Sequence, residues 1–316
     1  MAAGTSSNKV IYAALAGNLL VALTKFFAAV WTGSSAMFSE GIHSLVDTGN
    51  QLLMLYGIRR SGRPPDEMHP LGYGRELYFW SFIVALLIFA LGAGMSFYEG
   101  ITHIREPAAI ADPIVNYIVL GATMIFEGWS WLIALRAFEK NRGDLGYFAA
   151  VIRSKDPTSF IVLFEDSAAL AGIVIAFAGN FAAVRLNRPE LDGVASIGIG
   201  VVLAITAIIL AHESKGLLLG EPAREPIRRT ILDIVRHHPG VRRVGQLITV
   251  HMAPQQIVAI VDVDFSDNCS ASDVEHLVGA IERRIKEKCP DVVAFFINPK
   301  QMPDADRQRI GAAVPH

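Results

Sequence analysis

Two long uncharged apolar runs constrain the fold of this chain more than any other feature of its sequence. Residues 77–97 and 193–211 contain no charged side chain. A helix needs about 20 apolar residues to cross a bilayer, so each run is long enough to span one. Backbone polar groups must pair internally in lipid, and a helix satisfies all of them within one segment. The sequence therefore predicts a helical membrane protein.

Four further segments are apolar but carry isolated polar residues: 10–31, 35–58, 114–135 and 159–184. Polar groups are unfavourable against lipid, so we expect them to face the interior of a helix bundle. Together with the two uncharged runs, these segments predict six transmembrane helices within residues 1–214. The charged share of the whole chain, 18% against about 25% in soluble proteins, agrees with this prediction.

Basic residues are concentrated in two of the connections between the predicted spans. Segments 59–75 and 136–155 contain four and five Lys or Arg residues, whereas segment 104–113 contains one. The positive-inside rule then predicts that both termini are cytoplasmic, at the inner membrane if the host is bacterial. We also expect the first span to be retained rather than cleaved as a signal peptide, since no cationic segment or small-residue cleavage site accompanies it.

The pattern changes after residue 212 to that of a soluble domain. An amphipathic helix, two alternating strands and a last apolar strand are predicted at residues 225–238, 244–252, 256–265 and 291–297. A further helix is predicted from residue 272 to 288, with Ser272 and Glu275 at the spacing of a capping box.

The resulting order is helix, strand, strand, helix, strand (αββαβ). It predicts a small cytoplasmic α+β domain over residues 215–303. Residues 304–316 show no pattern, and we expect them to form a disordered tail.

Charge and motif content exclude several function classes. The 28 Lys and Arg residues against 30 Asp and Glu leave no basic excess for binding nucleic acid. Two cysteines, Cys269 and Cys289, are too few for a disulfide framework. An intramembrane metalloprotease would carry a motif such as H-E-x-x-H, and none occurs. We therefore expect neither an enzyme nor a resident cofactor.

Polar residues in segment 35–58 share one helix face. Glu40, His43, Asp47 and Asn50 stand at i, i+3, i+7 and i+10. An imidazole and a carboxylate four residues apart can bind the same divalent ion. This spacing indicates a metal site, and a polar interhelical hydrogen-bond network is the alternative.

A second acidic pair, Glu165 and Asp166, lies inside the fifth predicted span. Adjacent helical residues point about 100° apart, so the two carboxylates cannot face one partner equally. Acids on two helices of one bundle repel each other unless a cation or protons intervene, which favours a cation pathway. Lys25 could neutralise a buried acid or reach the membrane interface, and Glu127 could relay ions or bond to neighbouring Ser or Trp side chains.

The stretch AMFSEGIHSLVDTGNQLLML resembles the second transmembrane helix of the cation diffusion facilitator family. His43 and Asp47 occupy the positions of its metal-binding His/Asp-x-x-x-Asp motif. Residues 65–76 resemble the family's loop into the third helix, and the αββαβ segment resembles its metallochaperone-like cytoplasmic domain. The resemblance runs from about residue 9 to residue 300.

The chain departs from the family on the fifth helix. Asp166 matches the Asp of a second His-x-x-x-Asp motif, but Val162 stands four residues earlier. With its Glu-Asp-Ser-Ala-Ala sequence, this helix is similar to the divergent branch that includes zinc-transporter-nine-like proteins. The resemblance thus implies a ligand set of His43, Asp47 and Asp166. Glu165 is the expected fourth ligand; Glu40, Asn50 and a water molecule are alternates.

An accessory site is implied for the loop into the third helix. Asp66 and His69 match ligand positions there, but Tyr73 stands where a further histidine is often found. The alternative is a cytoplasmic loop that binds no metal.

The resemblance implies efflux of Zn²⁺ in exchange for protons by alternating access, in a homodimer held together by the soluble domains. The expected partners are therefore a divalent metal ion, protons, the lipid bilayer and a second copy of the chain. Because most candidate ligands are oxygens, a transporter of Mn²⁺, Fe²⁺ or Co²⁺ is an alternative. A non-transporting metal sensor or scaffold is another, because the fifth-helix histidine is missing.

Overall fold

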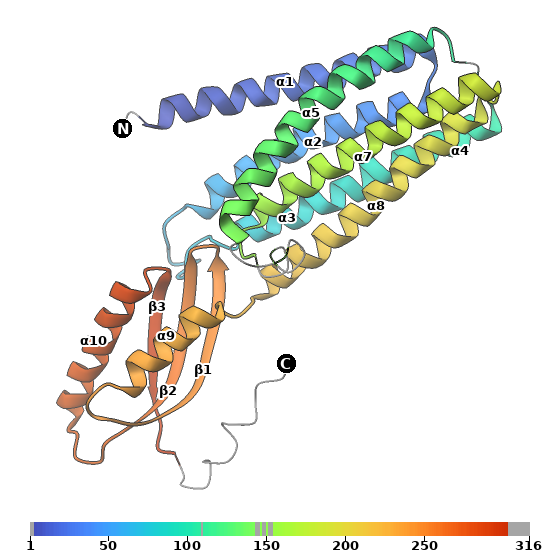
Figure 1. Cartoon of the computed structure of the whole chain (residues 1–316). Coiled ribbons are helices and arrows are strands. Elements are labelled where there is room, and N and C mark those ends of the chain that lie inside the picture. Colours follow the sequence, from blue (N-terminus) through green and yellow to red (C-terminus); the bar gives the residue numbers. More distant parts are fainter. Residues whose placement is uncertain (1–2, 109, 143–145, 147–149, 151–153, 303–316) are drawn as a thin grey trace. The chain divides into compact units, whose positions relative to one another are not determined.

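The computed structural model describes residues 3–302 except 109, 143–145, 147–149 and 151–153 (Figure 1). The chain separates into two units. The helical unit contains Met1–Pro64 and Glu76–Lys215, and the C-terminal unit contains Pro65–Arg75 and the chain from Gly216 onward. The expected tail at 304–316 lies outside the described residues.

The helical unit is a bundle of long helices (Figure 1). Its elements are α1 (Ala3–Thr32), α2 (Ser35–Ser61), α3 (Glu76–Leu87), the π-helical turn η1 (Ile88–Ala93), α4 (Gly94–Arg105), α5 (Pro113–Arg142), α7 (Pro157–Leu186) and α8 (Glu190–Leu219). Helices α3, η1 and α4 follow one another without a break. Helix α2 packs against α1, α3, α4 and α7, so the metal-motif helix occupies the middle of the bundle.

Four helical stretches among the described residues are long and apolar enough to cross a membrane: Glu76–Arg105, Pro113–Arg136, Phe160–Leu186 and Glu190–Leu219. A shorter apolar stretch covers Asn18–Thr32. Helix α2 does not reach the same hydropathy, because its polar face carries the predicted metal motif. The helical membrane domain is confirmed, while the number of six spans stays a prediction.

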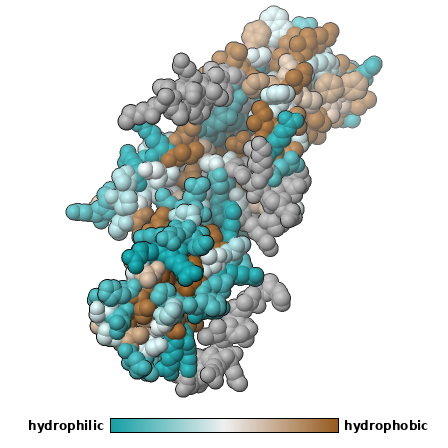
Figure 2. Space-filling view, turned by 60° about the vertical axis from the view of Figure 1, so that its left-hand side comes forward, coloured by the Kyte–Doolittle hydropathy of each residue, from teal (hydrophilic) through white to brown (hydrophobic). Residues whose placement is uncertain are grey.

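The helical unit exposes large apolar side chains and buries several charged ones. Phe27, Val30 and Ile125 are 66, 82 and 78% exposed, whereas Lys25 and Glu40 are fully buried. Figure 2 shows apolar residues gathered on the surface of this unit. Because water disfavours large apolar surfaces, this arrangement indicates a lipid environment around a bundle that shields its charged side chains.

The C-terminal unit has the predicted αββαβ order. Its elements are α9 (Glu225–Arg236), β1 (Val241–Ala253), β2 (Gln256–Phe265), α10 (Ala271–Lys288) and β3 (Val292–Pro299). In the sheet order β1-β2-β3, β2 pairs antiparallel with β1 and parallel with β3. Its core is formed by fully buried aliphatic side chains from both helices and β2: Ile231, Val235, Ile257, Val261, Ile281 and Ile285.

The capping box of α10 lies two residues earlier than predicted. Ser270 Oγ accepts a hydrogen bond from the Asp273 backbone N–H at 3.2 Å, and the Asp273 carboxylate accepts one from the Ser270 N–H at 2.8 Å. The prediction of Ser272 and Glu275 was wrong. The same polar-to-acidic spacing occurs at both positions, and the earlier pair starts the helix.

Candidate functional site

The start of α2 is anchored by a carboxylate from α8. Asp192 accepts hydrogen bonds from Ser34 Oγ at 2.9 Å, from Ser35 N at 2.6 Å and from Ala36 N at 3.2 Å. The first N–H groups of a helix have no partner within it, and a negative charge there is favoured by the helix dipole. The buried Asp192 therefore positions the helix that carries the metal motif.

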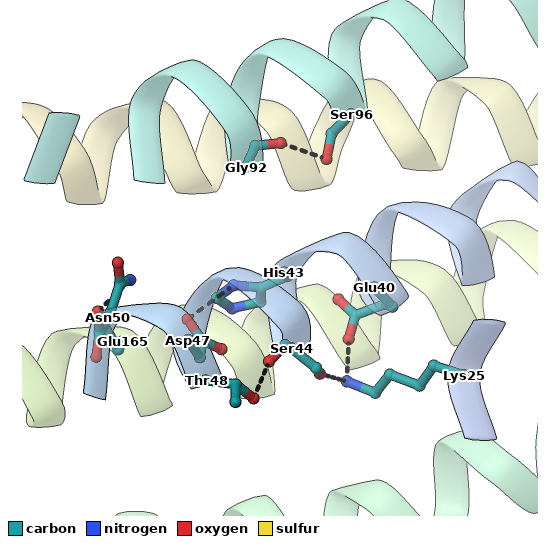
Figure 3. A network of polar contacts seen from close by, with 10 residues as sticks. All are labelled: Lys25, Glu40, His43, Ser44, Asp47, Thr48, Asn50, Gly92, Ser96 and Glu165. Atoms are coloured by element: carbon teal, nitrogen blue, oxygen red, sulfur yellow. Dashed lines mark hydrogen bonds and ion pairs between the residues drawn. The ribbon is translucent and has the colours of Figure 1, made fainter. Parts of the chain in front are cut away.

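His43 and Asp47 lie together on α2 (Figure 3). His43 Nδ1 is 3.3 Å from Asp47 Oδ1, with the imidazole buried and the carboxylate partly exposed. Among the described residues, neither ring nitrogen of His43 has a hydrogen-bond partner. Nε2 is thus free to ligate a cation while Nδ1 stays beside the Asp47 carboxylate, so this geometry fits the predicted motif.

Glu165 and Asp166 of α7 face different helices, as their angular separation predicts. Asn50 Nδ2 of α2 donates to Glu165 Oε1 at 2.8 Å. Ser130 Oγ of α5 donates to Asp166 Oδ2 at 3.0 Å. The two acids therefore differ in surroundings, since Glu165 is held against the motif helix and Asp166 against α5.

Lys25 of α1 forms an internal ion pair with Glu40 of α2 (Figure 3). The distance from Nζ to Glu40 Oε2 is 2.9 Å, and Nζ is also 2.9 Å from Ser44 Oγ. Both charged side chains are fully buried. Of the two roles considered for Lys25, the structure thus supports neutralisation of a buried acid.

A small polar cavity lies between α1, α2, α5 and α7. Its walls are formed by Asn18, Ser44, Asp47, Gln51, Glu127, Ser130, Val162, Glu165 and Asp166. Its volume is about 20 Å³, which is room for about one water molecule or ion. Four of the wall residues are acids. Val162 also contributes, so an apolar side chain occupies the position where the family that the sequence resembles carries a second histidine.

The structure brings only part of the predicted ligand set together. Asp47, Glu165 and Asp166 line the cavity, and His43 adjoins Asp47. Glu40 is engaged by Lys25. Within the described part of the chain, no three His, Cys, Asp or Glu side chains are arranged to hold a metal ion. The complete ligand set thus stays a prediction.

Glu127 of α5 is a wall residue that the predicted ligand set omits. The sequence identifies it as an acid within a span but does not assign it to the metal site. Glu127 lies three residues before Ser130, and this spacing alone places the two side chains on the same face of α5. Its place opposite the α2 and α7 acids depends on how α5 packs, which is a tertiary property.

Asp66, His69 and Tyr73 form a local cluster in the loop that belongs to the C-terminal unit. Tyr73 Oη donates to Asp66 Oδ2 at 2.6 Å and the His69 N–H donates to Oδ1 at 2.7 Å, and these bonds lower the pKa of Asp66 below its usual range. His69 Nδ1 is 3.6 Å from Asp66 Oδ1. The two predicted accessory residues are adjacent, while Tyr73 occupies one carboxylate oxygen.

Comparison with known proteins agrees with this architecture. Residues 11–219 match the family described as cation efflux transmembrane domain, and residues 223–299 match that described as cation efflux protein, cytoplasmic domain. The human "Proton-coupled zinc antiporter SLC30A9, mitochondrial" is 31% identical over 259 residues, covering 81% of this chain and 46% of that protein. "Metal tolerance protein C4" of Arabidopsis thaliana is 31% identical over 263 residues, covering 82 and 57%.

The "Cation-efflux pump FieF" of Escherichia coli O1:K1 / APEC is 25% identical over 293 residues, covering 91% of this chain and 90% of that protein. The chain spans about half the length of the SLC30A9 and C4 relatives. The transmembrane match alone covers well over half of the sequence. Together with the match of the cytoplasmic domain, it shows that this chain belongs to the cation efflux, or cation diffusion facilitator, family.

Proposed function

We propose that this chain exports a divalent metal cation, with Zn²⁺ as its cargo, in exchange for protons. The observation that carries this proposal is that Asp47 of α2 and Asp166 of α7 line one small polar cavity, with His43 beside Asp47. Imidazole and carboxylate groups are zinc ligands. Ionisable groups within membrane helices typically mark ion pathways.

The proposed ligands are His43, Asp47 and Asp166, with Glu165 as the fourth. Asn50 Nδ2 orients the Glu165 carboxylate, and Asn50 stays an alternate ligand because its Oδ1 has no hydrogen-bond partner among the described residues. Glu40 is paired with Lys25, which disfavours it as a ligand. Small movements of α7 against α2 would bring the acids closer around the ion and would also change which side of the membrane reaches the cavity.

Proton exchange would follow from competition for the same atoms. Imidazole and carboxylate groups bind a metal in their deprotonated forms, so metal binding releases protons and protonation releases the metal. Imidazole has an unperturbed pKa of about 6.5, which makes His43 the natural titrating group near neutral pH.

The architecture that accompanies this function is also proposed. Six helices within residues 1–214 would cross the membrane, with both termini in the cytoplasm and, in a bacterial host, in the inner membrane. The αββαβ domain over residues 215–303 would hold two protomers together as a homodimer. The match to the family's cytoplasmic domain supports this arrangement.

Zinc flux into proteoliposomes under an imposed pH gradient tests the proposal. We expect the parent to accumulate Zn²⁺ and both Asp47→Asn and Asp166→Asn to lose flux. Glu106→Gln is the matched control, because Glu106 is an exposed acid at the end of α4, away from the cavity. Parent-like flux in both cavity variants would show that the assigned site is wrong.

Two alternatives have specific support. The four acids of the cavity wall favour oxygen-preferring ions, so Mn²⁺, Fe²⁺ or Co²⁺ could be the cargo, and competition with zinc flux ranks them. Val162 lines the cavity at the position where the family carries a second histidine ligand, and the loss of that ligand supports a non-transporting sensor or scaffold. That alternative predicts metal binding by calorimetry without flux.

A further inference from the structure

The ion pair between Lys25 and Glu40 requires an explanation beyond stability. Both side chains are fully buried, and Nζ is 2.9 Å from Glu40 Oε2. Removing two charges from water is unfavourable enough that a buried pair is often no more stabilising than apolar residues of similar size. Charges within membrane helices tend instead to serve the ion pathway.

Both members of the pair lie next to the candidate metal site. Glu40 lies three residues before His43, so the two side chains are neighbours on one face of α2. Lys25 also donates to Ser44, which forms part of the cavity wall together with Asp47. The ammonium group thus contacts both a residue of the cavity wall, Ser44, and a carboxylate that the metal motif could recruit, that of Glu40 (Figure 3).

Glu40 has ligand capacity that the protein does not use. Its Oε2 is held by Lys25, but its Oε1 is buried and has no hydrogen-bond partner among the described residues. Oε1 lies so close to α7 that a Cβ added at Gly172 would overlap it. Glycine at this position therefore leaves room for a carboxylate at the α2–α7 interface.

We propose that Lys25 is a specificity residue that keeps Glu40 out of the transported ion's ligand set. This inference rests on the proposed function. Each added carboxylate oxygen makes a site more suitable for hard ions such as Mn²⁺, while imidazole suits Zn²⁺. By holding Glu40, Lys25 limits the oxygen ligands beside His43 and so favours Zn²⁺ over Mn²⁺.

The ratio of Zn²⁺ to Mn²⁺ affinity distinguishes two effects of removing Lys25: the release of Glu40 as a ligand and the loss of a positive charge near the site. Both ions carry two charges, so loss of the ammonium charge alone changes both affinities by a similar factor. An added ligand changes the ratio instead. We expect Lys25→Gln to shift the ratio toward Mn²⁺ by about tenfold, and Lys25→Arg to keep the parent ratio.

The measurement is calorimetric titration of the purified full chain with each metal alone. The double variant Lys25→Gln/Glu40→Gln should return to the parent ratio, because the released carboxylate is gone. An unchanged ratio in folded Lys25→Gln would overturn the inference. So would a shift that survives in the double variant, because Glu40 would then not be its source.

Glu40→Gln keeps the inference testable if Lys25→Gln does not fold. Since Glu40 is not a ligand in the parent, this variant should keep the parent ratio, and a changed ratio would contradict the inference. A parent that binds neither metal overturns the proposed function together with the inference. A parent with proton-driven zinc flux and an unshifted ratio in Lys25→Gln overturns the inference alone.

Discussion

Polar side chains of neighbouring helices meet in pairs around the cavity. Asn50 holds Glu165 across the interface of α2 and α7, and Ser130 holds Asp166 across that of α5 and α7. These two acids of α7 each have a partner that orients them, as expected for groups buried away from water. At this scale a single change can move one carboxylate while leaving the other in place.

Gly172→Ala is expected to disturb the carboxylate of Glu40. The added methyl group would overlap Glu40 Oε1, and Lys25 restrains that side chain from moving away. Overpacking of this kind typically lowers the free energy of unfolding by about 1–3 kcal/mol. Thermal unfolding in detergent, followed by circular dichroism, measures it. Gly121→Ala on α5 is the control, because nothing lies within 4 Å of its added Cβ. Equal melting temperatures for the two variants would contradict the expected overlap.

At the scale of elements, the bundle is organised around the start of α2. Asp192 lies in the first turn of α8 and caps α2, while Ser196, one turn further along α8, contacts Ser39. Two successive turns of α8 therefore fix the rotation of the motif helix. Because His43 and Asp47 lie within three turns of this anchor, their direction depends on it.

Asp192→Asn is expected to loosen the first turn of α2. An amide cannot accept all the hydrogen bonds that the carboxylate accepts, and it removes the charge favoured at a helix N-terminus. The free energy of unfolding is expected to fall by about 1–2 kcal/mol, as it does when a helix N-cap residue is removed. Hydrogen exchange of residues 35–40 should become faster. Glu190→Gln, in the same turn of α8, is the control, and slower or unchanged exchange in Asp192→Asn would contradict the capping role.

Ser270→Ala is expected to destabilise the start of α10 by about 1 kcal/mol. Hydrogen bonds from the Ser270 hydroxyl and backbone lower the pKa of Asp273. The stabilisation that ionised Asp273 contributes is therefore fully present above the unfolded-state pKa of about 3.9. It is lost as the pH falls through the lower folded-state pKa of Asp273.

Hydrogen exchange of residues 271–276 at pH 7 measures this effect. The difference between Ser270→Ala and the parent should shrink as the pH is lowered below about 3.9. Ser272→Ala is the matched control, since Ser272 is an exposed serine in the same turn. A larger effect from Ser272→Ala would show that the cap is misassigned.

At the scale of the whole molecule, the apolar exterior of the helical unit indicates that lipid surrounds it. The basic connection after α2 predicts which end faces the cytoplasm. We expect a membrane-impermeant maleimide to label Glu106→Cys in intact cells. We expect it to label Arg63→Cys only in permeabilised cells. Both positions are exposed, so reactivity reports sidedness. The reverse pattern would contradict the proposed orientation.

Much of the fold could be read from local patterns. The strands at 244–252, 256–265 and 291–297 were predicted within a few residues of β1, β2 and β3, because alternation depends on neighbouring residues. The cap of α10 was predicted two residues too late, because Ser270 with Asp273 and Ser272 with Glu275 both have the spacing of a capping box. Helix α2 was predicted as a span, yet it is not among the four described helical stretches that are apolar enough to cross a membrane, because one of its faces carries Glu40, His43 and Asp47.

By itself, the sequence determined the helical membrane class, the αββαβ order and the helix face shared by His43 and Asp47, because each follows from spacing along one segment. Only the tertiary structure decided that Lys25 pairs with Glu40, that Asn50 pairs with Glu165 and that Glu127 lines the cavity. These contacts join different helices, whether consecutive, as for Lys25 and Glu40, or 115 residues apart, as for Asn50 and Glu165. Their existence depends on the relative rotation and depth of packed helices, which no local pattern specifies.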